Sequence, residues 1–228
     1  MQTKTATQQD LGTVNRLLDA AERLFAEHGY DGVGMRQLAG EAQVNLHAAT
    51  YHFGSKENLF IETFMRRFRP AHTERLLLLQ EAEASGASRP LPVEKIVECM
   101  IRPLFELGVA HPVFYLLLGQ SLFNPPAFLH SAMHKEFGPN IEAFIQAFRR
   151  ALPKLPEDLI HLRTMWAMGG LLLFSVRAGE LPGMHNKEIH EALLQEMVRF
   201  MSAGMQSAPV LDSSQRPVLL VPPKGPRK

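Results

Sequence analysis

The chain has 228 residues, 46% of them hydrophobic and 21% charged, which are values typical of a globular protein with a sizeable core. Its formal net charge of +1 does not point to a nucleic-acid partner, and residues 1–60 carry five Lys and Arg side chains against seven Asp and Glu. A single cysteine, Cys99, excludes an internal disulfide and a multi-cysteine zinc site, and with no signal sequence at the N-terminus it leads us to expect a cytoplasmic protein.

An amphipathic helix is predicted over about residues 10–28, after a polar stretch at residues 1–9. Its apolar residues recur on one face: Val14, Leu17, Leu18, Ala21, Leu24 and Phe25. Gly29 stands where a glycine in the left-handed conformation would end such a helix. The apolar face is therefore available to cover the core formed by the segments that follow.

Residues 35–53 predict two short helices around a tight turn. The first has an apolar stripe at helical spacing: Met35, Leu38, Ala39 and Ala42. Asn45 can cap the second, over about 46–53, by accepting a backbone N–H. Helix, turn and helix is the helix-turn-helix arrangement, whose second helix enters the DNA major groove. The side chains that would point at base edges are Leu46, His47 and Ala48.

The next helix is predicted to open at Ser55-Lys56 and to be kinked or interrupted at Pro70. The ammonium of Lys56 would lie at the helix N-terminus, where the free N–H groups and the dipole favour a phosphate. For His52 two readings stay open, a partly buried ring that packs the helix end or a phosphate contact.

The rest of the chain predicts helices separated by proline and glycine, over about residues 92–109, 112–122, 126–151, 157–179 and 186–206. No segment has the pattern of a strand. We therefore expect an all-α protein with a three-helix DNA-binding domain at 1–54 and a helical effector-binding and dimerisation domain at 55–207. Residues 208–228 are expected to form a disordered, basic, proline-rich tail.

The segment MRQLAGEAQVNLHAATYHFGSKENLF resembles the N-terminal domain of the TetR family of bacterial transcriptional repressors, and the likeness extends over Thr13 to Phe60. Its most specific part is YHFGSKENLF. The resemblance implies that Lys56 contacts the DNA backbone and that Arg36 reaches a base or a phosphate. The DNA-binding residues expected from the motif and the resemblance together are Arg36, Asn45, Leu46, His47, Ala48, Thr50, Tyr51, His52 and Lys56.

Three positions depart from the family pattern. Gly34 replaces the usual Thr or Ser that caps the second helix, so that phosphate contact is lost or made by backbone. Gln43 replaces the turn glycine and must adopt a strained φ or shift the turn. Thr50 replaces a phosphate-contacting aromatic residue. We therefore expect weaker anchoring to the DNA backbone.

The body is similar to the fatty-acid-responsive subgroup of this family, which implies a homodimer and an apolar effector such as a fatty acid or acyl-CoA. The apolar run of residues 165–176 is too short to span a membrane, so a buried helix is expected there, pairing with the last helix and a symmetry mate. The residues predicted to bind the effector are Met100, Leu104, Phe105, Phe114, Leu118, Phe123, Met133, Phe137, Phe144, Arg163, Trp166, Phe174 and Arg177. Any single Phe or Met of this set is more often ordinary core than pocket lining, and each Arg is more often a surface residue.

Other chemistry is not expected. His130 and His134 have the i, i+4 spacing of metal ligands but lack further ligands, so a solvated face is favoured over a metal site. No nucleophile elbow, phosphate-binding loop, dinucleotide fingerprint or paired carboxylates occur, so neither an enzyme nor a cofactor is predicted. The alternative to a DNA-binding repressor is an all-α ligand-binding or protein-interaction module without sequence-specific DNA binding.

Overall fold

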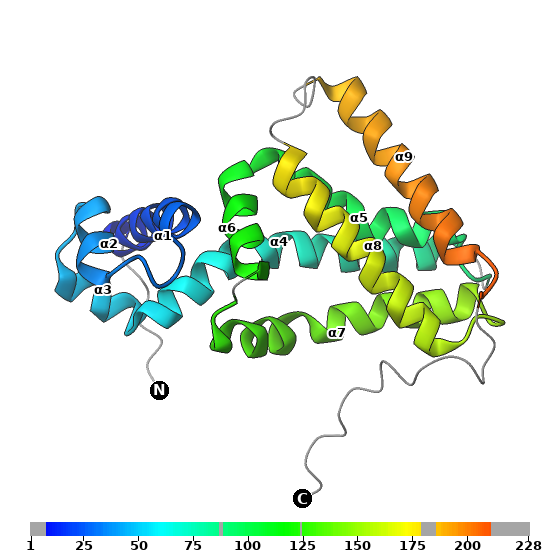
Figure 1. Ribbon diagram of the computed structural model, residues 1–228, viewed down its shortest axis with the longest axis horizontal. Coiled ribbons are helices and arrows are strands. Elements are labelled where there is room, and N and C mark those ends of the chain that lie inside the picture. The colour runs from blue at the N-terminus through cyan, green and yellow to red at the C-terminus, as the bar shows by residue number, and fades with distance from the viewer. Residues whose placement is uncertain (1–7, 87–88, 124, 179–185, 211–228) are drawn as a thin grey trace, which may run out of the picture. The chain divides into compact units, whose positions relative to one another are not determined.

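The computed structural model describes residues 8–86, 89–123, 125–178 and 186–210 (Figure 1). Within these ranges the chain contains α-helices and no strand, so the all-α prediction is confirmed. The helices are α1 (Gln8–His28), α2 (Met35–Glu41), α3 (Leu46–Phe53), α4 (Lys56–Ser85), α5 (Val93–Ala110), α6 (Pro112–Phe123), α7 (Ala127–Ala151), α8 (Glu157–Ala178) and α9 (Lys187–Gln206). The predicted tail from residue 211 onward lies outside the described residues.

The predicted helix ends agree closely with the observed ones, because most of them coincide with proline, glycine or a capping side chain. Gly29 has φ +70° and its N–H bonds to the Phe25 carbonyl, as expected for the residue that ends α1. An interruption at Pro70 is not observed, since α4 continues through it to Ser85. The sequence around Pro70 is strongly helix-forming on both sides, and this outweighs the one backbone hydrogen bond that proline removes.

The chain divides into two compact units, one of residues 1–70 and 110–136 and the other of residues 71–109 and 137–228. The first unit therefore contains α6 and the start of α7 in addition to the first three helices and the beginning of α4. The functional boundary predicted after residue 54 stays a prediction, because packing alone does not test it.

In the first unit, α1 is joined to α4 by a buried carboxylate. Glu22 is only 7% exposed and accepts hydrogen bonds from Arg66 Nη2 at 2.7 Å and from Arg67 Nε at 2.9 Å. Arg66 also donates to Asp19 at 2.7 Å. Three charged side chains are thus partly or fully removed from water, and each requires the others to compensate for lost hydration.

An aromatic cluster completes the same junction. The Phe25 and Phe60 rings meet edge to face at 4.8 Å, and Phe60 also contacts Tyr30 at 5.1 Å and Phe128 at 5.9 Å. α6 packs on α1, where Gln120 Nε2 donates to the Ala26 carbonyl at 2.6 Å. These contacts connect the end of α1 to α4, α6 and the start of α7.

In the second unit, a histidine and an arginine on α4 are buried side by side. The His72 ring stacks on Phe137 at 4.0 Å, and His72 Nδ1 lies 3.2 Å from Arg75 Nη1. The Arg75 guanidinium also lies 4.9 Å from the centre of the Phe144 ring. Burial, and then the Arg75 charge, lower the pKa of His72 to about 3, so the imidazole is neutral in the folded protein.

In the single chain α8 is only partly buried, and its predicted burial against a symmetry mate stays a prediction. One stripe of α8 is buried, formed by Ile160, Arg163, Thr164, Ala167, Leu171 and Ser175, but Trp166 and Leu173 are each 63% exposed. By length and composition the segment Glu157–Val176 could cross a membrane, with only 28% of it buried. When a helix is apolar on all sides, the sequence alone does not show whether it is buried in the core of its own chain or against a partner.

We predict that Glu22→Gln will destabilise the folded protein by about 3 kcal/mol, because two guanidinium groups lose the carboxylate that compensates them. The measurement is the free energy of unfolding in urea at fixed protein concentration and neutral pH. Glu62→Gln is the matched control, since the Glu62–Arg69 pair is almost half exposed and should contribute below about 1 kcal/mol. Equal losses in both variants would contradict the role of Glu22.

We predict a second effect on stability, which depends on pH. The pKa of His72 is lower in the folded than in the unfolded chain, so the unfolded chain binds the extra proton and stability falls as the pH drops from 6.5 towards 3. His72→Phe keeps a ring against Phe137 and should remove about 2 kcal/mol of this loss between pH 6.5 and pH 5. The measurement is the unfolding free energy across that range, and exposed His134→Gln is the control. If His72→Phe retained the wild-type slope, the burial of a neutral imidazole would not be its source.

Candidate nucleic-acid interface

The turn between α2 and α3 is held by backbone and cap hydrogen bonds. Asn45 Oδ1 accepts the Ala48 N–H at 2.7 Å, which confirms the predicted cap of α3. Gln43 has φ +54°, the only positive φ of a non-glycine residue among the described residues. The turn therefore keeps its usual geometry and Gln43 carries the strain that a glycine would avoid.

The start of α2 lacks a side-chain cap. Gly34 occupies the N-cap with φ −104° and makes no capping hydrogen bond, because glycine has no side chain. A phosphate contact at this place can come only from backbone N–H groups. The side chain of Arg36, in the first turn of α2, is exposed and supplies the positive charge nearest to that end.

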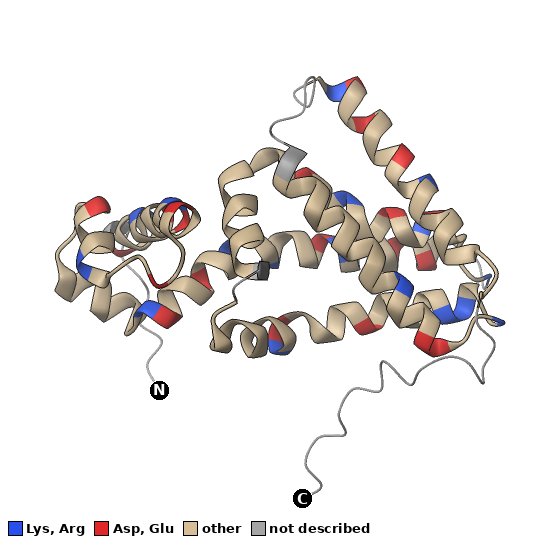
Figure 2. Cartoon of the chain, in the orientation of Figure 1, with Lys and Arg blue, Asp and Glu red and all other residues tan. Residues whose placement is uncertain are grey.

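One face of α3 is open to solvent. Its exposed side chains, spaced at i, i+1, i+4 and i+5, are Leu46, His47, Thr50 and Tyr51. Ala49 and Phe53 are buried on the opposite side and fix the helix to the core. α3 carries no Asp, Glu, Lys or Arg, so no carboxylate on the helix itself opposes a DNA phosphate (Figure 2). The predicted base-reading residues therefore share one accessible face, with Ala48 half-buried at its edge.

Two of the predicted DNA-binding side chains have partners inside the protein. The His52 side chain is 14% exposed and its Nε2 lies 4.0 Å from Asp10 Oδ1, which favours the packing reading over the phosphate contact. Thr50 is exposed, but its hydroxyl donates to the Leu46 carbonyl at 3.0 Å. A phosphate needs a hydrogen-bond donor, and the hydroxyl proton of Thr50 is already used. The hydroxyl must therefore rotate away from the Leu46 carbonyl before it can bind a phosphate.

Lys56 is at the first residue of α4, as predicted, but its ammonium is bound within the protein. Nζ donates to the Tyr30 carbonyl at 3.1 Å and lies 4.0 Å from the centre of the Tyr30 ring. Ser55 caps the same helix by accepting the Asn58 N–H at 3.2 Å. A DNA phosphate at this helix end would compete with Tyr30 for the lysine.

Tyr30, the internal partner of Lys56, is a residue of this region that the sequence did not reveal. It lies 26 residues before Lys56, and no periodicity or motif connects the two. A tyrosine directly after the glycine that ends a helix is a weak signal of a contact with Lys56, because the sequence does not show where the side chain at that position points.

The residues predicted to bind an effector are distributed over both units, and most are core. Buried ones are Met100, Leu104, Phe105, Phe114, Leu118, Phe137 and Phe144. Met133 and Phe174 are half-buried, and Trp166 is exposed. Arg163 Nη1 donates to the carbonyls of Met205 and Ser207, each at 2.8 Å. The side chains of Phe123 and Arg177 lie outside the described part of the chain.

The remaining candidates have structural explanations. The His130 and His134 rings are parallel at 6.5 Å, and no group of three possible metal ligands occurs among the described residues. Cys99 is buried, and burial raises the pKa of its thiol. A thiol that stays protonated in the core is a poor nucleophile and a poor redox sensor.

Two family models match the chain. The one described as "Bacterial regulatory proteins, tetR family" matches residues 17–63, and the one described as "Tetracyclin repressor-like, C-terminal domain" matches residues 98–204. The first match includes the whole helix-turn-helix, Tyr30 and Lys56. The second includes α6 to α8 and most of α5 and α9. Together the two matches cover more than half of the chain.

Individual proteins are similar over shorter stretches or at lower identity. The transcriptional repressor AcnR of Corynebacterium glutamicum is 47% identical over 45 residues, which are 20% of this chain and 24% of AcnR. The transcriptional repressor NicS of Pseudomonas putida is 28% identical over 142 residues, 62% of this chain and 60% of NicS. The chain thus matches a quarter to three fifths of these relatives' lengths.

Among solved structures, the fatty acid degradation regulator FadR from Bacillus halodurans superposes with a TM-score of 0.60. The alignment covers 90% of this chain and all of FadR, with 15% sequence identity. At that identity the likeness shows a shared fold.

Proposed function

Because the chain belongs to the TetR family of bacterial regulatory proteins, we propose that it is a DNA-binding transcriptional regulator that acts as a repressor. The observation that carries the proposal is the open face of α3, on which Leu46, His47 and Tyr51 lie together beside a buried anchor. An α-helix with such a face fits the major groove. Repression is proposed because two relatives, AcnR and NicS, are named as repressors. The expected place of action is the cytoplasm.

A homodimer is proposed from the unpartnered face of the second unit. Exposed apolar side chains lie on α8 and α9, namely Met165, Trp166, Leu173, Ile189 and Phe200, the last 77% exposed. No heavy atom lies within 4 Å of a Cβ built on Gly169, so a second helix can approach closely there. Burying this surface against a symmetry mate would form a four-helix bundle and place two heads on a near-palindromic operator.

We propose that an apolar effector, such as a fatty acid or an acyl-CoA, binds the protein and releases it from the operator. The family regulates through small molecules, and FadR, a fatty acid degradation regulator, shares the fold. The Phe- and Met-rich interior of the second unit suits a deformable apolar site. Arg75, buried beside Phe144 in that interior, provides the positive charge that an acyl carboxylate needs.

We predict that selection from random DNA will return a near-palindromic sequence, and that His47→Ala will weaken binding to it by at least about tenfold through loss of a base contact in each head. Lys56→Met should lower the affinity and reduce the slope of log K against log salt by about two, one phosphate contact per head. Binding is measured by fluorescence anisotropy over a salt series.

The controls are His134→Ala and Lys135→Met, which remove the same side-chain types from the exposed surface of α7. Both should bind like wild type. A selection that returns no sequence would favour the alternative, a ligand-binding or interaction module without specific DNA binding. The excess of acidic over basic residues in residues 1–60 supports that alternative.

For the effector we predict that palmitate raises the melting temperature and lowers operator affinity, whereas hexadecanol, which lacks the carboxylate, has a smaller effect on both. Arg75→Leu should abolish the difference between the two ligands. If palmitate and palmitoyl-CoA neither bind in native mass spectrometry nor shift the melting temperature, the effector is not an acyl compound. That result would leave the proposal of operator binding standing.

A further inference from the structure

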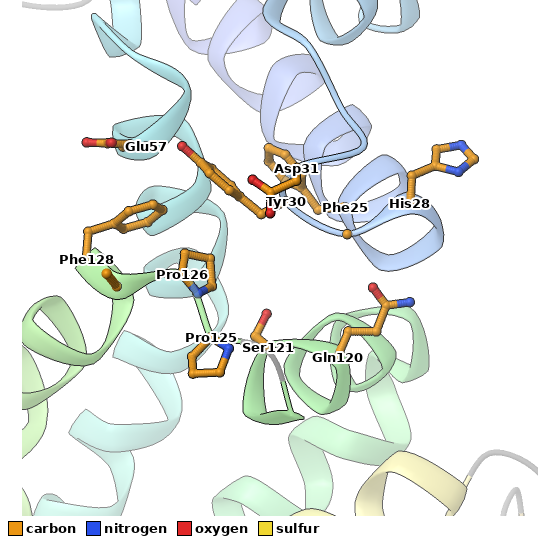
Figure 3. A pocket seen from close by; sticks show the side chains of 12 residues that line it. Phe25, His28, Tyr30, Asp31, Glu57, Gln120, Ser121, Pro125, Pro126 and Phe128 are labelled. Carbon is orange, nitrogen blue, oxygen red and sulfur yellow. The ribbon is translucent and has the colours of Figure 1, made fainter.

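A cavity of about 700 Å³ lies within the first unit, and none of its 12 lining residues belongs to the predicted effector site. It is bounded by the end of α1 and the loop after it, the first turn of α4, the end of α6 and the start of α7 (Figure 3). This volume is within the range of small-molecule sites. We propose that the cavity binds a small organic cation, a protonated amine carried on an apolar body.

The charge of the lining supports a cation. Asp31 and Glu57 bring two exposed carboxylates to it, and neither Lys nor Arg lines it. Figure 3 shows the Asp31 carboxylate beside the Tyr30 ring and the His28 imidazole pointing away. Burial, and then Glu57 and Asp31, raise the pKa of Tyr30, so its hydroxyl stays neutral and the two carboxylates remain the formal charges of the site.

Two side chains of the lining, Gln120 and Ser121, leave an oxygen available as acceptor. Ser121 donates its hydroxyl proton to the Leu117 carbonyl at 2.9 Å, and Gln120 donates from Nε2 to the Ala26 carbonyl at 2.6 Å, so both keep an oxygen as acceptor. The Gly29 N–H is used by the Phe25 carbonyl. Pro125 and Pro126 have no N–H at all. A ligand rich in N–H donors would satisfy these oxygens, whereas an anion or a hydrocarbon would not.

The apolar part of the ligand has rings to pack against. Tyr30 and Phe128 meet edge to face at 5.0 Å, and both are half-buried, with Phe25 behind them. The Lys56 ammonium already lies 4.0 Å from the centre of the Tyr30 ring, so the apolar body of the ligand, and not its ammonium, is expected to contact this ring. An aromatic or aliphatic amine could therefore pack its apolar body against these rings and place its ammonium near a carboxylate of the lining.

The test compares two probes of similar shape and opposite charge on the full chain, 2-phenylethylammonium and 3-phenylpropionate, by isothermal titration calorimetry. We expect saturable one-to-one binding of the cation per chain and at least about tenfold weaker binding of the anion. The double variant Asp31→Asn, Glu57→Gln should lose at least about tenfold in cation affinity. Ala127→Trp, which fills the cavity from the start of α7, should prevent binding.

The matched control is Glu74→Gln, Glu81→Gln, which removes two exposed carboxylates of the second unit and should leave cation affinity unchanged. No saturable binding of the cation up to about 10 mM would overturn the proposal, since fragment-sized ligands of a real site bind in that range. So would equal binding of both probes, or unchanged affinity in Asp31→Asn, Glu57→Gln. These measurements contain no DNA, so their outcome is independent of operator binding.

Discussion

A buried carboxylate helps to fix the position of α2 and α3, the helices proposed to read DNA. Glu22 receives hydrogen bonds from Arg66 and Arg67, and through them α1 is fixed to α4. Both α2 and α3 pack on α1, so the distance between the recognition helix and the first turn of α4 is set by this contact together with the aromatic cluster around Phe60. Charged groups with restricted geometry define a register that an apolar interface, which tolerates sliding, would define less well.

On this support the recognition surface is formed before DNA is present. The Asn45 cap, the positive φ of Gln43 and the burial of Phe53 determine which side of α3 faces outward. The strain at Gln43 is compensated by neighbouring backbone hydrogen bonds, since the Val44 N–H reaches the Ala39 carbonyl at 2.9 Å. Binding then needs no refolding of the head, and its cost is limited to side-chain ordering and the release of internal partners.

Local signals made the helices and the turn predictable. Apolar periodicity, prolines and the Asn45 cap act over a few residues, and the need for a positive φ at Gln43 follows from its place in the motif. Contacts between distant segments were not predictable. The Lys56–Tyr30 bond and the cavity join parts of the chain whose proximity exists only in the fold. Which side chains of α8 are buried in its own chain and which are exposed was also not predictable, because the helix is apolar on nearly every side.

If Lys56 binds a phosphate as proposed, its internal bond makes operator binding an exchange of partners. To neutralise a phosphate, the ammonium must leave the Tyr30 carbonyl and ring, so the lysine contributes the difference between two favourable states and not the full value of a phosphate contact. In the proposed regulator this exchange lowers the net affinity for every site alike, which shortens the residence time at non-specific sites and favours movement between sites along a chromosome.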